Sequence, residues 1–186
     1  MIENILKMIN ELLDGLIKQP IRSLILFGIL FRTFFFLFFY TSITIFPDSD
    51  GYIELANFVS SWNLEGYHGL RSLGYPMVIS FFNQNLYAVL LFQFVIGIIS
   101  MIFWYKILLN LKFSIKSSFI ITIFLSSFIN IFFYETCILV ESLVLFMMSI
   151  LFYLLSTKIL DRLNIFLLIG LSLFFSYLVL IKPFYA

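Results

Sequence analysis

Five long apolar runs constrain the fold of this chain more than any other feature of its sequence. The runs cover about residues 23–46, 86–109, 117–134, 138–157 and 164–181. A helix needs roughly 20 apolar residues to cross the hydrocarbon core of a bilayer, so each run is long enough to span, the third only just. We therefore predict an all-α, polytopic helical membrane protein with about five transmembrane helices.

The composition excludes several other classes of protein. Charged residues make up 11% of the 186 residues, whereas a soluble domain carries about 25%. So little charge cannot cover a globular surface, which rules out a cytosolic fold. The net charge of +1 excludes nucleic-acid binding through a basic surface as the main function. The single cysteine, Cys137, excludes an internal disulfide, and the single histidine, His68, excludes a site built from several histidines.

Residues 1–20 have the pattern of an amphipathic helix that lies in the membrane interface. Apolar side chains recur at helical spacing from Ile2 to Ile17, with charged residues between them. Pro20 ends this helix, because proline removes a backbone donor. The segment is not a signal peptide, since its charges are mixed and the next apolar run is too long.

The basic residues predict that the N-terminus is cytoplasmic. Eight of them then lie on the cytoplasmic side, as the positive-inside rule requires. They are Lys7, Lys18, Arg22, Lys106, Lys112, Lys116, Lys158 and Arg162. Arg32 lies within the first run, where we interpret it as structural and facing other helices. The chain is thus expected in the cell (inner) membrane, with residues 47–85 as an outer loop containing short surface helices at about 51–61 and 76–82.

Two carboxylates, Asp48 and Asp50, begin this outer loop directly after the first run. Carboxylates this close together can hold a divalent cation, or one of them can act as a general base. The alternative is that Asp50 or Ser49 caps the surface helix, because both residue types are favoured at helix N-termini. Capping requires only one residue, so it leaves Asp48 unexplained.

Three further residues at the predicted outer face are candidates for contact with a phosphate-bearing substrate. Arg71 carries the guanidinium fork that binds phosphate, although interfacial arginines also contact lipid headgroups. Glu141 lies just inside the fourth run, where a carboxylate indicates a function unless it reaches the interface. Glu135, in the turn before it, is expected to be solvated more easily. Lys182 closes the fifth run, and its alternative role is to snorkel to the interface.

Four sequence elements, in order, resemble the N-terminal part of the GT-C superfamily of membrane glycosyltransferases. The nearest likeness is to the bacterial branch related to dolichyl-phosphate-mannose protein mannosyltransferases, and it covers about residues 22–186. After Arg32 in the first run, the elements are Asp48-Ser49-x-x-Tyr52-x-x-Leu55-Ala56, Arg71-x-x-Gly74-Tyr75-Pro76, Glu141-Ser142-Leu143 and the stretch from Gly170 to Pro183. Leu73 stands where the family usually has proline, and Lys182 where it usually has arginine.

The resemblance implies an inverting glycosyltransferase that moves a sugar from a polyprenyl-phosphate donor to a lipid, glycan or protein acceptor at the outer face. Asp48 would be the base that takes the proton of the acceptor hydroxyl. The residues that would contact the donor or line its site are Arg71, Tyr75, Glu141 and Lys182. In some members a divalent cation, Mg²⁺ or Mn²⁺, assists the departure of the phosphate, and Asp48 with Asp50 would hold it.

Family members usually have more spans, so residues 21–186 are expected to be the N-terminal part of a longer transmembrane domain and to be inactive alone. Two other classes stay open, namely a membrane transporter or lipid flippase, and a non-catalytic assembly subunit. A transporter predicts charges at mid-depth and broken spans. The uninterrupted fourth and fifth runs, and charges gathered at one face, favour chemistry at the interface instead.

Overall fold

The computed structural model describes residues 2–39, 42–63, 65, 67, 71–157 and 164–181. Within these residues the chain is helical and has no strand, so the predicted all-α fold is confirmed. In chain order, the helices are α1 (Ile2–Ile17), α2 (Pro20–Phe39), α3 (Pro47–Ser60), α4 (Gly74–Phe81), α5 (Leu86–Asn110), α6 (Ile115–Ser126), α7 (Ile129–Thr136), α8 (Glu141–Ser156) and α9 (Ile165–Ile181).

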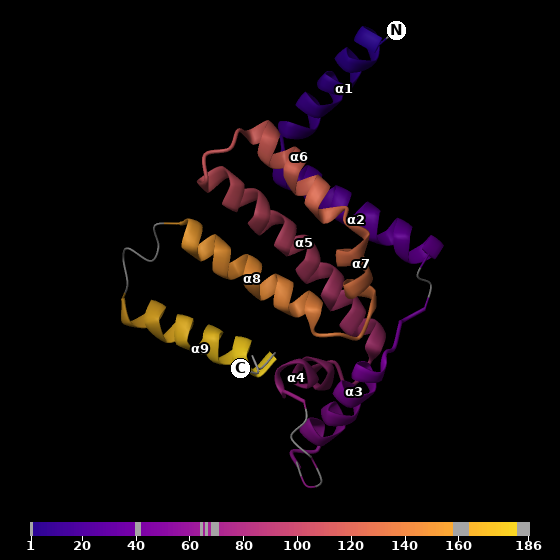
Figure 1. The fold of residues 1–186 in the computed structure, drawn as a ribbon, viewed down its shortest axis with the longest axis vertical. Helices are drawn as coiled ribbons and strands as arrows, with labels where there is room; N and C mark the ends of the chain where they lie inside the picture. The colour runs from indigo at the N-terminus through magenta and orange to yellow at the C-terminus, as the bar shows by residue number, and fades with distance from the viewer. Residues whose placement is uncertain are drawn as a thin grey trace.

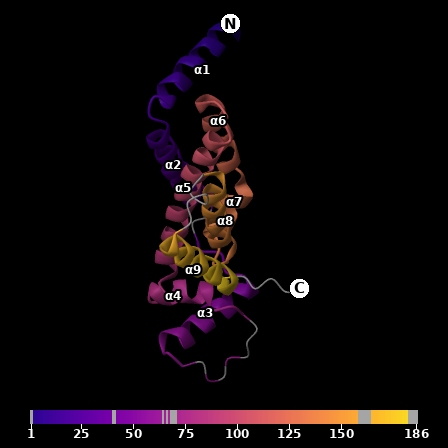
Figure 2. The ribbon, with the colours of Figure 1, turned by 90° about the vertical axis from the view of Figure 1, so that its left-hand side faces the viewer.

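Helix α5 is the centre of the bundle. It packs against α2, α4, α6, α7 and α8, and its contact with α8 is the most extensive (Figure 1). Seen from the side, α5, α6 and α8 overlap, so the bundle is thin (Figure 2). Helices α3 and α4 lie at one end of the molecule and α1 extends from the opposite end. The molecule therefore has two distinct ends, separated by the length of α5.

The helices coincide with the predicted apolar runs, but fewer of them meet the length of a membrane span. In the described part of the chain, α2 and α5 are long and apolar enough to cross a membrane, and α6 with α7 forms a third span if the bent pair counts as one. Helices α8 and α9 have 16 and 17 residues. At 1.5 Å per residue they extend about 24–26 Å, less than the roughly 30 Å of hydrocarbon. The apolar helices support membrane association, whereas the number of spans stays a prediction.

The third apolar run is broken into α6 and α7, which meet at an angle of 54°. Helix α6 ends at consecutive serines, and the Ser127 hydroxyl donates to the carbonyl of Ile123 at 2.7 Å. Phe128 then adopts an extended backbone before α7 begins. Serine pairs and such back-bonding bend helices without proline or glycine. The bend directs the end of α7 toward α5 and α2.

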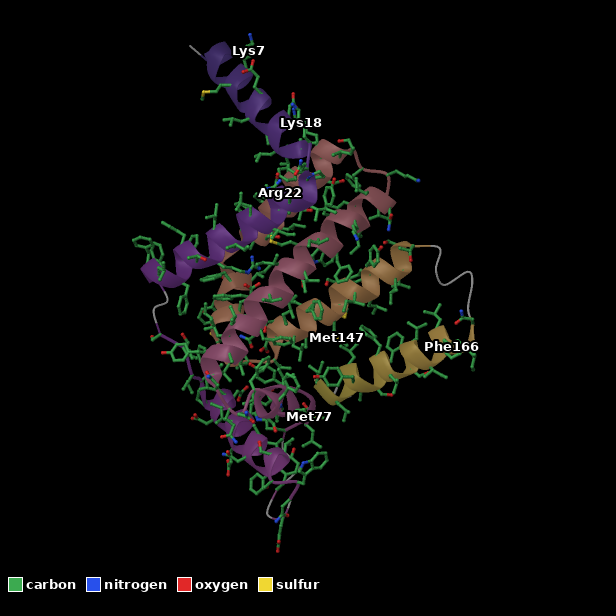
Figure 3. The ribbon with its side chains drawn as sticks, turned by 180° about the vertical axis from the view of Figure 1, so that it is seen from behind. Lys7, Lys18, Arg22, Met77, Met147 and Phe166 are labelled. Carbon is green, nitrogen blue, oxygen red and sulfur yellow. The ribbon has the colours of Figure 1, made fainter. Side chains whose placement is uncertain are left out.

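Helix α1 and the start of α2 carry several of the basic side chains. Lys7, Lys18 and Arg22 lie at the end of the molecule opposite Met77 of α4 (Figure 3). Pro20 both separates α1 from α2 and occupies the first position of α2, where its missing donor costs nothing. The last turn of α1 is attached to α6 by an ion pair of 3.6 Å between Asp14 and Lys116.

Helices α3 and α4 connect α2 to α5 and match the two short helices predicted in this loop. Helix α3 begins earlier than predicted, with Pro47 in its first turn, so Asp48 and Asp50 belong to the helix itself. The Ser49 hydroxyl accepts a hydrogen bond of 3.0 Å from the backbone N–H of Phe46. Ser49 therefore supplies the capping interaction, and the two aspartates are not needed for it.

The end of α9 docks on the start of α4. The hydroxyls of Ser72 and Tyr177 donate to the carbonyls of Ile181 and Gly74, at 2.7 and 3.1 Å respectively. A Cβ at Gly74 would lie 2.7 Å from the backbone of Leu180 and Ile181, so only glycine permits this approach. The contact fixes α4 from one side while α3 packs on the other.

Candidate functional site

Asp48 and Arg71 form an ion pair at the end of the molecule that holds α3 and α4. Asp48 lies in the first turn of α3, and Arg71 precedes α4 by three residues. The Arg71 Nη2 donates to Asp48 Oδ1 at 2.5 Å, and the side chains are 36% and 57% exposed. An exposed pair of this kind contributes only about 0–1 kcal/mol to stability. Both groups therefore remain accessible to a ligand that competes for either of them.

The Arg71 guanidinium also lies over the ring of Tyr52, 5.5 Å from its centroid. Burial raises the pKa of Tyr52, and Glu141 and Asp48 raise it further, while Arg71 lowers it. The phenol is therefore protonated at neutral pH. The structure therefore brings together Asp48 and Arg71, two of the residues predicted at one face, beside the ring of Tyr52.

Glu141 lies between Val140 and Leu143, which pack in the same hydrophobic core as Tyr52. It is the first residue of α8 and is half-buried. A carboxylate in the first turn of a helix is stabilised by the positive end of the helix dipole. The negative charge of Glu141 also contributes to the raised pKa of Tyr75, which is due mainly to burial. Glu141 thus begins an apolar helix, and its place at the edge of a membrane span stays a prediction.

Tyr75 does not lie where a phosphate ligand was predicted. Its side chain is 1% exposed, and its hydroxyl donates to Gln93 Oε1 at 2.6 Å. Its ring packs edge to face against Tyr52, with 5.3 Å between centroids. Tyr75 therefore supports the ring of Tyr52, and its hydroxyl is already used in the bond to Gln93.

Gln93 is a polar residue that the sequence reasoning missed, although it interrupts the apolar run that became α5. Its side chain is 1% exposed and completes three hydrogen bonds. It accepts from Tyr75, and its Nε2 donates to the carbonyls of Glu135 and Cys137 at 2.8 and 2.9 Å. Gln93 thus joins α4 and α5 to the segment that follows α7.

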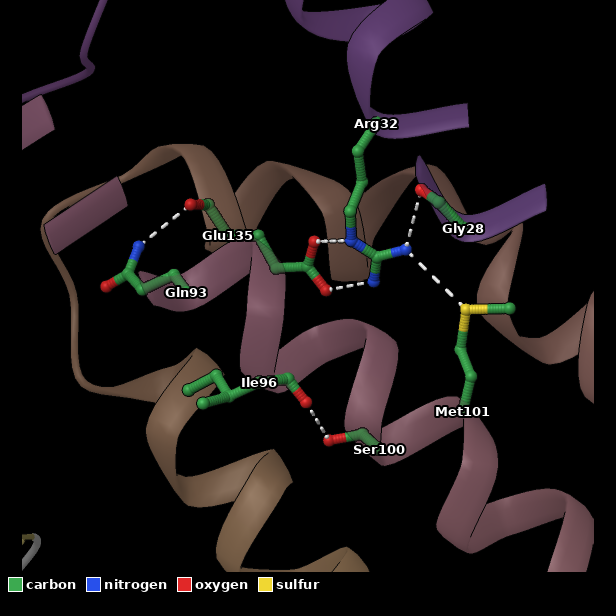
Figure 4. A network of polar contacts seen from close by, with 7 residues as sticks. All are labelled: Gly28, Arg32, Gln93, Ile96, Ser100, Met101 and Glu135. Atoms are coloured by element: carbon green, nitrogen blue, oxygen red, sulfur yellow. Dashed lines mark hydrogen bonds and ion pairs between the residues drawn. The ribbon is translucent and has the colours of Figure 1, made fainter. Parts of the chain in front are cut away.

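A second charged cluster lies within the bundle, where Arg32 of α2 meets Glu135 of α7 (Figure 4). The Arg32 Nε and Nη2 donate to the two oxygens of Glu135 at 2.7 and 2.6 Å. The two residues are 4% and 2% exposed, so the expectation that Glu135 is solvated in a turn was wrong. The bend in the third apolar run carries Glu135 inward, and Arg32 faces other helices as predicted.

Gly97 of α5 provides the space for this pair. A Cβ at Gly97 would clash with Glu135 Oε1 and would lie 2.6 Å from Arg32 Nη2. The Arg32 Nη1 also lies 3.4 Å from the carbonyl of Gly28 and 3.6 Å from the Met101 sulfur. The pair is therefore enclosed by α2, α5 and α7.

A divalent cation shared by Asp48 and Asp50 does not fit the described residues. Both belong to the first turn of α3, and side chains two residues apart on a helix do not face each other. Asp48 already accepts a hydrogen bond from the Arg71 guanidinium. Within the described ranges, no group of three or more histidine, cysteine or acidic side chains could hold a metal ion. The predicted Mg²⁺ or Mn²⁺ stays a prediction with no support from this geometry. Lys182, the other predicted phosphate contact, lies outside the described residues.

Comparison with known proteins identifies no relative of this chain. No family model, curated protein or solved structure matches it. The likeness to GT-C glycosyltransferases therefore rests on the four sequence elements alone, and the chemistry must be argued from the residues of the site.

Proposed function

We propose that this chain forms the donor-site region of a membrane glycosyltransferase that uses a polyprenyl-phosphate-linked sugar. The observation that carries the proposal is the ion pair between Asp48 and Arg71 over the ring of Tyr52. The pair joins a carboxylate that can accept a proton to a guanidinium that can bind a phosphate. The two residues belong to the first two of the four elements that resemble the family.

In the proposed reaction the donor phosphate competes with Asp48 for Arg71. The exchange is inexpensive because the exposed pair is weak and the phosphate brings a second negative charge to the same fork. Asp48, released from Arg71, accepts the proton of the acceptor hydroxyl. The hydroxyl oxygen then bonds to the anomeric carbon with inversion, and the electrons of the broken sugar–oxygen bond go to the phosphate, which Arg71 stabilises.

The proposed setting is the outer face of the cell (inner) membrane, with five spans, a cytoplasmic N-terminus and residues 47–85 outside. In this arrangement α3 and α4 meet both the membrane surface and outer water. Lys182 adds a second cation next to the phosphate in this proposal, and Glu141 lines the donor site. The acceptor is a lipid, glycan or protein that presents a hydroxyl group.

Substitution of Asp48 tests this proposal. We expect Asp48→Asn to lower sugar transfer by about 10²–10⁴-fold, because asparagine cannot accept the proton. Asp50→Asn is the matched control, since it removes the same charge two residues away, and it is expected to have a mild effect. The measurement is transfer from radiolabelled polyprenyl-phosphate-mannose and polyprenyl-phosphate-glucose, in membranes with equal amounts of each variant of the full-length protein.

The role of Arg71 has its own measurement, which does not require turnover. Polyprenyl phosphate should raise the unfolding temperature of the wild-type protein, because a ligand that binds only the folded state stabilises it. Arg71→Gln should lose most of this increase, and Arg22→Gln should keep it. The proposal is contradicted if the Asp48 and Asp50 variants transfer sugar at equal rates. It is also contradicted if polyprenyl phosphate raises the unfolding temperature of the Arg71 and Arg22 variants equally.

A second candidate function is favoured by a different observation. The buried pair of Arg32 and Glu135 lies beside a broken apolar run, and both features are typical of transporters and flippases. In proteoliposomes, a flippase accelerates the movement of a fluorescent polyprenyl phosphate between leaflets, and Glu135→Gln reduces that rate. A transferase leaves the rate unchanged.

A further inference from the structure

Trp62 ends α3 in a backbone conformation that is usual for glycine at the end of a helix. The N–H groups of Trp62 and Asn63 donate to the carbonyls of Val59 and Phe58, at 3.1 and 3.2 Å respectively. These two bonds form a Schellman motif, in which the residue at the position of Trp62 is commonly glycine. The φ of Trp62 is 52°, in the left-handed region that disfavours residues with a Cβ.

The side chain of Trp62 makes little contact with the rest of the described chain. Trp62 is 97% exposed, more than any other large apolar residue in the part of the chain that the structure describes. Glycine would form the same helix end with less backbone strain. Packing within the chain therefore does not explain a tryptophan at this position, and its large ring, with an apolar body and a polar N–H, favours a contact outside the chain.

Helix α4 presents a second exposed apolar group close to its end. Phe81, the last residue of α4, is 81% exposed, and Met77, one turn before it, is 48% exposed. Tyr75 and Ile79 of the same helix are buried in the hydrophobic core. Since positions four apart share one helix face, Met77 and Phe81 form an apolar row that faces away from this core.

The ends of α3 and α4 lie side by side. The hydroxyls of Ser60 and Ser80 form a hydrogen bond of 2.8 Å, and the two helices pack along each other. Trp62 follows Ser60 by two residues, and Phe81 directly follows Ser80. We call Trp62, Met77 and Phe81 together the apolar edge of the α3–α4 pair.

The apolar edge lies at the end of the bundle where α5 begins (Figure 1). Residues 82–85 join α4 to α5, which is long and apolar enough to cross a membrane. This turn contains Asn83, Gln84 and Asn85, and Tyr87 in the first turn of α5 is 64% exposed. A change from polar to apolar residues with an exposed tyrosine is typical of the boundary between lipid headgroups and hydrocarbon.

The apolar edge is continuous with the apolar surface of the bundle. A shallow hollow of about 290 Å³ lies beside it, and the atoms that line the hollow are almost all apolar. The lining residues come from α4, the turn after it, α5 and α9, and they are Met77, Val78, Phe81, Phe82, Phe92 and Tyr177. Because this surface runs from α4 onto apolar helices without a polar break, lipid suits it better than water does.

We propose that the apolar edge binds phospholipid at the boundary between headgroups and hydrocarbon, and thereby attaches α3 and α4 to the bilayer. The ring of Trp62 lies among the first acyl carbons, and its N–H donates to the polar groups above them. Met77 and Phe81 contact acyl chains that enter the hollow. This proposal does not depend on the transferase reaction, because none of the three residues belongs to the Asp48 cluster, and it does not depend on which leaflet the edge meets.

The fluorescence of Trp62 tests this proposal. Trp104 is the only other tryptophan of the chain, so Trp104→Phe leaves Trp62 as the sole reporter. The full-length protein is reconstituted in phosphatidylcholine vesicles whose acyl chains carry bromine either close to the headgroups or near the chain ends, because bromine quenches a tryptophan that it contacts. Iodide added to the buffer quenches only a tryptophan that water reaches. We expect bromine close to the headgroups to remove most of the fluorescence of Trp62, bromine near the chain ends to remove less, and iodide to remove little.

Three further variants each carry a single tryptophan, in a background of Trp62→Phe and Trp104→Phe. Phe81→Trp places the reporter on the other helix of the apolar edge, and it should respond to bromine and iodide as Trp62 does. Asn57 is exposed on the polar face of α3 that also carries Glu54, so Asn57→Trp should be quenched by iodide and not by bromine. Val95 is 47% exposed well inside α5, so Val95→Trp should be quenched most by bromine near the chain ends.

The proposal is overturned if Trp62 or Phe81→Trp responds as Asn57→Trp does, because the edge then lies in water. It is also overturned if neither bromine nor iodide quenches these two reporters, because a protein surface then covers the edge. A response of Trp62 equal to that of Val95→Trp places its ring deep in the hydrocarbon and overturns the proposed contact with the boundary.

Discussion

At the scale of single residues, the two charged clusters are held in different ways. Asp48 lies in the first turn of α3 and Arg71 in the segment before α4, and both are accessible, so a ligand can separate them. Arg32 and Glu135 are enclosed by three helices, and the absence of a side chain at Gly97 creates their space. In the proposed reaction a phosphate displaces Asp48 from Arg71, whereas the enclosed pair of Arg32 and Glu135 fixes the relative positions of α2, α5 and α7.

Gly97→Ala is expected to destabilise the protein. The added methyl group would clash with the Glu135 carboxylate, which cannot move aside because Arg32 holds both its oxygens. Overpacking of this kind costs about 1–3 kcal/mol, and each kcal/mol lowers the unfolding temperature of a chain this size by about 2–4 °C. Thermal unfolding in detergent measures the change.

Gly170→Ala is the matched control for this substitution. Nothing lies within 4 Å of a Cβ at Gly170 of α9, and alanine stabilises a helix relative to glycine by about 0.5–1 kcal/mol. Gly170→Ala should therefore leave the unfolding temperature unchanged or raise it. Equal behaviour of the two variants would show that the pair does not fill the space beside Gly97.

The positions of some of these charged residues can be predicted from the sequence, and those of others cannot. The distribution of basic residues predicts that Asp48, Arg71 and Glu141 lie at one face, because the positive-inside rule assigns the loops to the two sides of the membrane. The partner of Arg32 is not predictable in this way, since Glu135 reaches it only through the bend after α6. Tyr75 differs from its prediction for a similar reason: its direction depends on how α4 packs, which the local sequence does not specify.

At the scale of elements, α4 depends on α9 for its position. The two helices approach so closely at Gly74 that their backbones nearly touch, and the contact joins segments more than 100 residues apart, as the bond between Tyr177 and Gly74 shows. Helices α3 and α4 are therefore not an independent loop. Their geometry requires the last described helix of the chain.

Gly74→Ala is expected to weaken the docking of α9. The new Cβ would meet backbone atoms of Leu180 and Ile181 at 2.7 Å, and backbone cannot rotate away as a side chain does. A cost of about 1–3 kcal/mol corresponds to roughly five- to hundredfold faster local opening. Hydrogen–deuterium exchange of residues 165–181 measures it.

Gly51→Ala provides the comparison for this experiment. A Cβ at Gly51 would lie 3.4 Å from the flexible side chain of Arg71, which can adjust. Exchange in α9 should stay at the wild-type rate in this variant. If Gly74→Ala also leaves the exchange of α9 unchanged, the close approach does not determine the position of α9.

The bounds of a helix are predicted well wherever a long apolar run defines the helix. Long apolar runs gave α5 and α9 to within a residue or two, because burial in a bilayer tolerates few exceptions. The break between α6 and α7 has no proline or glycine to signal it, only consecutive serines in an apolar context. Serines occur in many straight helices, so the bend cannot be predicted from sequence alone.

At the scale of the whole molecule, the two ends differ in chemistry. One end holds α3, α4 and the Asp48 cluster, and the other carries the basic residues of α1 and the turn between α5 and α6 (Figures 1 and 3). The thin bundle between them consists mainly of apolar helices. The arrangement fixes which residues lie at opposite ends, and the charge bias predicts one of the two possible orientations in the membrane.

Cysteine labelling of intact cells is expected to show that the end with α3 and α4 faces outside. Glu65 lies after α3 and is exposed, and Lys112 is exposed in the turn after α5. In a Cys137→Ala background, a membrane-impermeant maleimide should label Glu65→Cys in intact cells, and Lys112→Cys only after the membrane is permeabilised. The reason is that Lys and Arg near span ends are retained in the cytoplasm, and eight of them lie toward the end with Lys112 in the predicted topology. The reverse pattern would place Asp48 and Arg71 in the cytoplasm, where transfer to an outer acceptor is impossible, and would overturn the proposed function together with the topology.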